Sequence, residues 1–174
     1  MGAQEYRYDT EVVRLFYDHA STVVWFPYPV PYEESGLSPT LVADLQAWGR
    51  LHDTGLDHEQ QWRSPELPAM ADEQRQGLAH RLGDELGSAF EVEFDVPRGV
   101  WFGPRKTSYR SSEPPTNPEA AAIFTAWADE ARAERAELAQ RAAEGWSSDE
   151  SFGWYAVQPD SGQKFVPRER PTQE

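Results

Sequence analysis

The chain has 174 residues, of which 39% are hydrophobic and 13% aromatic, and its formal net charge is -14 at pH 7. This length and apolar content suffice for one domain with a buried core. The absence of cysteine excludes disulfides, thiolate metal sites and a cysteine nucleophile. The acidic charge argues against nucleic acid and anionic membrane as partners and favours a basic protein.

The first element that we expect is a β-hairpin close to the N-terminus. Residues Val12–Tyr17 and Val23–Phe26 are rich in branched and aromatic side chains, which suit strands, and the polar residues between them suit a turn. Val23–Phe26 is continuously apolar, a pattern typical of a strand that is covered on both faces. We therefore predict that the second strand lies in the centre of the sheet.

A proline-rich segment follows the hairpin. Prolines at every second position from Pro27 to Pro31 prevent a regular strand and favour an extended, polyproline-like backbone. A stiff backbone of this kind can display aromatic side chains to a partner at low entropic cost. The aromatic anchors predicted on this basis are Trp25, Tyr28 and Tyr32. The alternative is that the segment only wraps the core.

Three dipeptides that join a capping residue to a proline predict helix starts: Ser38-Pro39, Ser64-Pro65 and Asn117-Pro118. The helices expected after them span Pro39–His52, a stretch from Ser64 to Leu86, and Glu119–Glu144. We expect Pro68 to interrupt the start of the second helix and Gly87 to end it.

The remaining strands are predicted from shorter patterns. Phe90–Asp95 alternates apolar and acidic residues, which indicates a half-exposed strand, and a short strand is expected near Trp101. Trp154–Val157 and Gln163–Val166 are expected to form a C-terminal hairpin. A basic group is interpreted as part of a solvated loop: Arg98, Arg105, Lys106 and Arg110.

Together these elements predict an α+β fold. Its sheet would be mixed or antiparallel and built on the N-terminal hairpin, with the three helices packed mainly on one face. We treat residues 1–174 as one domain that could divide into a core of residues 1–110 and a second part of residues 118–174. No run approaches the roughly 20 apolar residues of a membrane helix, so we expect a cytoplasmic protein without membrane contact.

One polar cluster is a candidate metal site: His52, Asp53, Asp57 and His58. Imidazole and carboxylate groups can bind zinc or a harder divalent ion, which would suit a metal-dependent hydrolase. The spacing matches no established ligand pattern, and the alternative is a polar helix end followed by a loop. The sequence contains neither a phosphate-binding glycine loop nor a nucleophile elbow, and we expect no cofactor.

The acidic residues suggest a binding function. Between Ser38 and Pro97 the chain has twelve acidic and four basic residues, so this region would attract a basic protein. The predicted partner-binding residues are Trp25, Tyr28, Tyr32, Glu33, Glu34, Asp53, Asp57 and Glu59. In composition the chain is similar to inhibitor and immunity-type proteins, which neutralise basic toxins or nucleases. This similarity implies a non-enzymatic binding module. The alternatives are the metal-dependent hydrolase and a phage or assembly component whose long helix makes symmetric contacts, and the oligomeric state is left open.

Overall fold

A computed structural model describes residues 3–96, 105–143, 156–157 and 164–165, and the chain divides into two compact units, Met1–Ala133 and Glu134–Glu174. The fold is α+β with a mixed sheet, as predicted. The helices are α1 (Ala3–Thr10), α2 (Pro39–Gly55), α3 (Leu67–Leu86) and α4 (Pro118–Ala143), with a short 3-10 helix, η1, at Tyr32–Glu34. The strands are β1 (Val12–Leu15), β2 (Val24–Trp25), β3 (Glu91–Val96), β4 (Arg105–Tyr109), β5 (Ala156–Val157) and β6 (Lys164–Phe165).

The sheet of the first unit has four strands in the order β2-β1-β3-β4. β1 pairs antiparallel with β2 and parallel with β3, and β3 pairs antiparallel with β4. The strand expected in the centre, β2, is therefore an edge strand, and that prediction was wrong. Its neighbour Phe26 owes its burial to aromatic packing, because its ring lies 5.5 Å from the rings of Phe90 and Phe124 rather than between two strands.

The proline-rich segment is not extended. The backbone amide of Phe26 donates to the carbonyl of Tyr28 at 2.8 Å, and Pro29 forms an isolated bridge back to Trp25. The chain therefore makes a tight turn that folds against β2. Because proline has no amide to offer, the turn blocks further pairing at this edge of the sheet.

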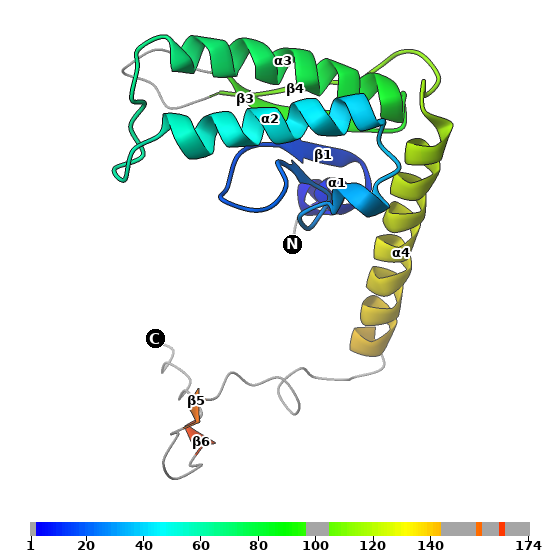
Figure 1. The fold of residues 1–174 in the computed structure, drawn as a ribbon. Coiled ribbons are helices and arrows are strands. Elements are labelled where there is room, and N and C mark those ends of the chain that lie inside the picture. Colours follow the sequence, from blue (N-terminus) through cyan, green and yellow to red (C-terminus); the bar gives the residue numbers. More distant parts are fainter. Residues whose placement is uncertain (1–2, 97–104, 144–155, 158–163, 166–174) are drawn as a thin grey trace. The chain divides into compact units, whose positions relative to one another are not determined.

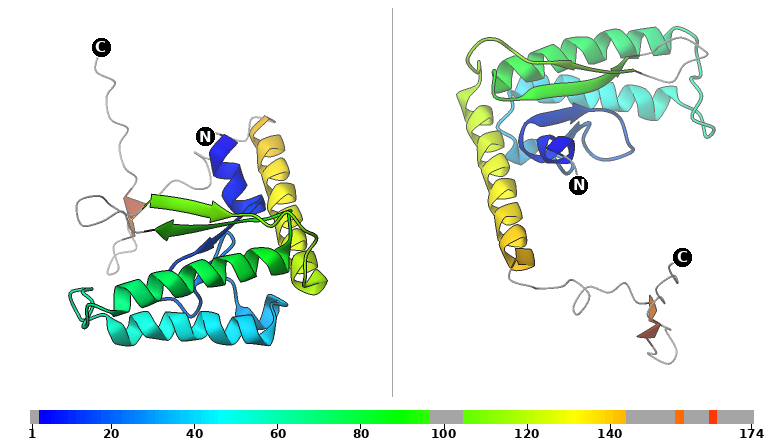
Figure 2. Two further views of the ribbon diagram at one scale, coloured as in Figure 1. Left: turned by 90° about the horizontal axis from the view of Figure 1, so that it is seen from above. Right: turned by 180° about the vertical axis from the view of Figure 1, so that it is seen from behind.

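The two faces of the sheet are chemically different. Val13 and Leu15 of β1 lie beside Val92 and Phe94 of β3, and all four are buried in the core. α3 packs on this face and α2 lies alongside α3, whereas α1 lies on the opposite side of the sheet (Figures 1 and 2). The opposite face carries the alternating polar residues, starting with Arg14 of β1 and Glu93 of β3.

Two of the three predicted helix starts are confirmed. The Ser38 side chain accepts a hydrogen bond from the amide of Leu41 at 3.3 Å, and Asn117 Oδ1 accepts from the amide of Ala120 at 3.2 Å. Each cap satisfies an amide that has no partner within its helix. α4 then packs on the core through Phe124.

The third predicted start was wrong. α3 begins at Leu67, and Pro68 lies in its first turn, where a proline costs no hydrogen bond. The Ser64 hydroxyl bonds the carboxylate of Glu66 instead of capping a helix. Gly87 ends α3 with a φ of 74°, as expected for a glycine in this position.

The sequence analysis also missed two elements. No helix was predicted where α1 lies, and Arg105 and Lys106 were placed in a loop but lie on the edge strand β4. The strand expected near Trp101, and Arg98 with it, fall outside the described residues. In the second unit, β5 and β6 pair antiparallel, which is compatible with the predicted C-terminal hairpin.

Candidate functional site

A pocket of about 310 Å³ opens where the β1–β2 connection meets α2 and η1. Its lining includes Tyr17 after β1, Tyr32 of η1, and Gln46, Arg50 and Asp53 of α2. We call this the Tyr17 pocket. It joins segments that are well separated in the sequence, so only the folded first unit can form it.

Local periodicity explains why these side chains meet. Alternation along β1 directs Tyr17 to the same side as Leu15, which is the side of α2 and α3. On α2, Gln46, Arg50 and Asp53 follow one another at spacings of four and three residues and therefore share one helix face. The helix thus presents an amide, a cation and a carboxylate to one pocket.

The hydroxyl of Tyr17 is the centre of the hydrogen bonding. It donates to Asp53 Oδ1 at 2.6 Å and lies 2.8 Å from His19 Nδ1. Burial, together with the hydrogen bond to Asp53, raises the pKa of Tyr17 to about 12, so its proton stays in place at neutral pH. Because the hydroxyl has a single proton and donates it to Asp53, the hydrogen bond with His19 must be donated by Nδ1–H of the imidazole to the tyrosine oxygen.

His52 packs against Tyr17 of the pocket and has a structural role there rather than a chemical one. Its imidazole is buried among the rings of Tyr17, Trp48 and Trp62, with centroid distances of 4.8, 4.4 and 5.1 Å. Its Nδ1 lies 2.9 Å from the carbonyl oxygen of Trp48 and donates to it. Burial lowers the pKa of His52, so the ring is neutral at neutral pH and serves as a packing group.

The four residues of the candidate metal site are not brought to one point. Asp57 Oδ1 accepts the amides of Glu59 and Gln61, at 2.8 and 3.0 Å, and so closes the loop after α2. The side chain of His58 is 88% exposed. In residues 3–96 and 105–143 no group of three or more His, Cys, Asp or Glu side chains is placed to hold a metal ion.

The aromatic residues predicted to bind a partner lie in three different settings. Tyr28 is 78% exposed at the turn after β2. Trp25 is half-buried, and its ring stacks on Phe16 at 5.0 Å. Tyr32 is half-buried in the Tyr17 pocket, where its hydroxyl accepts the amide of Val23 at 3.2 Å.

The predicted acidic residues divide in a similar way. Asp53 meets Tyr32 in the pocket, and Glu33 and Glu34 are exposed directly after Tyr32. Asp57 and Glu59 belong to the loop after α2. The sequence analysis missed Tyr17, Gln46 and Arg50. Helical spacing from Asp53 was the signal that could have identified the last two.

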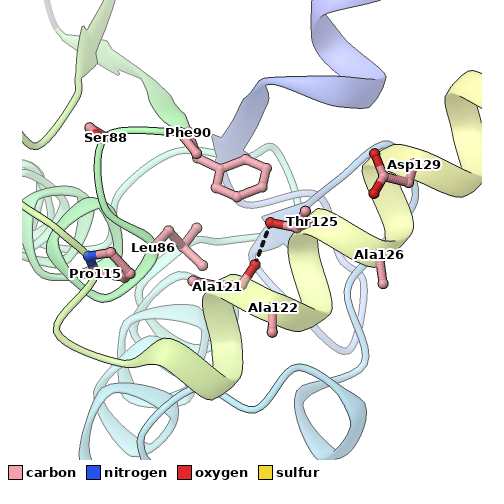
Figure 3. A pocket seen from close by; sticks show the side chains of 10 residues that line it. Leu86, Ser88, Phe90, Pro115, Ala121, Ala122, Thr125, Ala126 and Asp129 are labelled. Carbon is pink, nitrogen blue, oxygen red and sulfur yellow. Dashed lines mark hydrogen bonds between the residues drawn. The ribbon is translucent and has the colours of Figure 1, made fainter.

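A second cavity, of about 440 Å³, lies between α4 and the start of β3 (Figure 3). Small residues of α4 line one side, and Leu86, Phe90 and Pro115 line the other. The Thr125 hydroxyl already donates to the carbonyl of Ala121 at 2.7 Å, and Asp129 pairs with Arg132. The polar side chains that α4 contributes to this cavity are therefore engaged within the helix, and the Tyr17 pocket is the better candidate site.

No protein-family model matches this sequence, and no curated protein is significantly similar to it. Among the helices that the structure describes, none has the length and apolar character needed to cross a membrane. The function must therefore be inferred from the chemistry of the site.

Proposed function

We propose that this protein is a non-enzymatic, acidic binding module of the inhibitor or immunity type, and that it docks on a basic protein. In this proposal the Tyr17 pocket receives a lysine or arginine side chain of the partner. The observation that carries the proposal is the Asp53 carboxylate, which is exposed, lines the pocket and is held in position by the Tyr17 hydroxyl at 2.6 Å.

The pocket offers the groups that recognise a basic side chain. Tyr17 occupies only one of the carboxylate oxygens of Asp53, so an incoming cation can bind the other through a charge-assisted hydrogen bond. The rings of Tyr17 and Tyr32 add apolar surface for the aliphatic part of a lysine or arginine. Both tyrosines are hydrogen-bonded in the free protein, which reduces the entropy that binding must remove.

Exposed carboxylates are adjacent in sequence to two residues that line the pocket. Asp18 follows Tyr17 in the chain, and Glu33 and Glu34 follow Tyr32. No hydrogen bond or ion pair engages these three side chains within the described residues, so their charge is available to a partner. With a net charge of -14, long-range attraction would steer a basic protein toward the molecule, and association should weaken with added salt.

Arg50 lines the same pocket and reduces its negative charge. It makes no ion pair with a described residue, and it lies one helical turn before Asp53. If the pocket accepts a cation, Arg50 repels it. Arg50→Gln should therefore strengthen binding, whereas Asp53→Asn should weaken it.

The test is affinity capture from a lysate of the source cells with four versions of the chain: wild type, Asp53→Asn, Arg50→Gln and Glu73→Gln. Glu73 is the matched control, because it is an exposed acid on α3 with no described partner and lies outside the pocket. We expect a basic protein to be retained at low salt and released at high salt. The affinity for this protein should fall roughly tenfold or more with Asp53→Asn, because one hydrogen bond to a charged group is lost. It should stay unchanged with Glu73→Gln. Equal capture by wild type and Asp53→Asn would refute the pocket as the docking site.

A further inference from the structure

The polar face of the sheet carries a second group of side chains, formed by Tyr8, Arg14, Phe16 and Trp25, which we call the Arg14 cluster. Arg14 and Trp25 are directly paired residues of β1 and β2, so their side chains share this face. The guanidinium carbon of Arg14 lies 5.5 Å from the ring centre of Tyr8 and 5.7 Å from that of Phe16. Phe16 in turn stacks on Trp25 at 5.0 Å. The arginine is thus held between aromatic rings in one orientation.

Two hydrogen-bond donors of this cluster are not satisfied. Arg14 Nε and Trp25 Nε1 are both buried and have no hydrogen-bond partner among the residues that the structure describes. The rest of the guanidinium is used only in part, since Arg14 Nη2 donates to the carbonyl of Pro27 at 2.9 Å. A buried donor without an acceptor costs roughly 1–3 kcal/mol, and such groups are rare in folded proteins.

Arg14 also lacks a counter-ion among the described residues. β3 has three carboxylates on this face. Glu93, which is opposite Arg14 in the strand register, binds the Tyr8 hydroxyl and Lys106, and Glu91 binds Arg7 and Arg110. Asp95 makes no ion pair with Arg14. In a chain with 30 acidic and 16 basic residues, a half-buried arginine that forms no ion pair with a described residue is unusual. The absence cannot be attributed to a shortage of acidic side chains.

We propose that the Arg14 cluster is a binding site for a carboxylate group. A carboxylate has two acceptor oxygens in one plane, which match the planar donors of a guanidinium and can reach a neighbouring indole N–H. The occupant is either a small organic acid or a carboxylate of an acidic peptide, because both present the same group. Since Arg14 Nε and Trp25 Nε1 are covered in the free protein, binding involves a rotation of one of these side chains. This site is distinct from the Tyr17 pocket and takes a ligand of opposite charge.

The experiment is a titration of the full-length, 15N-labelled protein with sodium acetate, followed through the indole and arginine Nε–H resonances. Trp25→Phe assigns the indole signal of Trp25. We expect that signal and the Nε–H signal of Arg14 to shift in a saturable way. The indole signal of Trp48 should stay in place, because its Nε1 already donates to the carbonyl of Ala71 at 2.8 Å. Sodium chloride at equal ionic strength should cause no saturable shift.

Variants separate binding from folding. Arg14→Gln should abolish the shift of the Trp25 indole, and Arg14→Lys, which keeps the charge but not the planar donors, should weaken acetate binding severalfold. If Arg14→Gln fails to fold, Trp25→Phe preserves the ring stack, and the acetate affinity read from Arg14 Nε–H should still fall. A short peptide ending in glutamate that binds at least tenfold more tightly than acetate identifies a peptide carboxylate, and equal affinity identifies a small acid. No saturable shift, or the same shift with chloride, would overturn the proposal and leave ordered water or an adventitious ion only as the partner of these donors.

Discussion

Gly83 of α3 lies against the ring of Tyr109 on β4, so closely that a Cβ atom at position 83 would be 2.6 Å from Tyr109 Cδ1. The same tyrosine donates from its hydroxyl to Asp84 Oδ1 at 2.7 Å, and its ring stacks on His80 at 4.2 Å. One residue of the edge strand thus fixes the distance between α3 and the sheet. Glycine is required there because any side chain would push the strand away.

Gly83→Ala should therefore destabilise the protein. The added methyl group must displace either Tyr109 or α3, and overpacking of this kind costs about 1–3 kcal/mol. The control is Gly77→Ala on the same helix, where the new Cβ would meet nothing within 4 Å. That change should stabilise the helix by roughly 0.5–1 kcal/mol. Chemical denaturation of both variants measures the two effects, and a neutral Gly83→Ala would contradict the packing described.

A second prediction concerns Glu85 of α3. Its carboxylate accepts hydrogen bonds from the amide of Ser38 at 2.9 Å, from the Ser38 hydroxyl and from Asn117 Nδ2 at 2.9 Å. Since Ser38 and Asn117 cap α2 and α4, one carboxylate holds two helix starts against a third helix. Glu85→Ala should lower the free energy of unfolding by roughly 2–3 kcal/mol, as expected when several donors lose their acceptor. Glu73→Ala, at an exposed position of α3, is the control and should change it by less than about 0.5 kcal/mol.

Tyr17 should make stability depend on pH in the alkaline range. Its pKa is raised in the folded state from 10.0 to about 12, so the folded state holds the proton more tightly than the unfolded state. The stabilisation that results from the raised pKa of Tyr17 is complete below pH 10 and is lost as the pH rises from there through about 12. Tyrosinate absorbance measured against pH should show a late-titrating group that disappears in Tyr17→Phe. In Asp53→Asn that group should titrate earlier, because one of the causes of the shift is removed.

His52 should produce the opposite dependence in acid. Burial lowers the pKa of His52 below its ordinary value of 6.5, so the unfolded state takes up a proton more readily than the folded state. The contribution of His52 to the free energy of unfolding is complete above pH 6.5. It is lost as the pH falls through the pKa that His52 has in the folded state. Denaturation measured at a series of acidic pH values should give a shallower decline for His52→Phe than for wild type. His58→Gln controls for the loss of a histidine at an exposed position.

The parts of the fold that could be predicted are those with a local cause. Ser38 and Asn117 form caps because their side-chain oxygens reach an amide three residues later, a geometry that needs no tertiary contact. Ser64-Pro65 has the same pattern and fails, because the loop before α3 turns the Ser64 hydroxyl toward Glu66. β4 could not be predicted from its own residues. Arg105 and Lys106 have weak strand propensity, and the pairing with β3 determines their conformation.

The candidate site was predicted only in part, for a similar reason. Asp53 and Tyr32 were selected for charge and aromatic character, and the structure brings them into one pocket. Tyr17, whose hydroxyl donates to Asp53, was not selected, because the sequence presents it as an ordinary strand residue. The position of β2 was mispredicted because a continuous apolar run indicates that the segment is buried but not which element covers it. Phe26 is covered by Phe90 and by Phe124 of α4.

The parallel pairing of β1 with β3 determines the order in which the molecule can be built. Val13 and Val92 are neighbours across these strands, yet all of β2, α2 and α3 lie between them in the sequence. On the ribosome, β1 emerges before β2, α2 and α3 and has no partner on its inner edge until β3 has been synthesised. The α2–α3 pair, whose contacts are closer in sequence, can form earlier. β1 is thus made before the elements that separate it from β3, and its pairing is completed only after them.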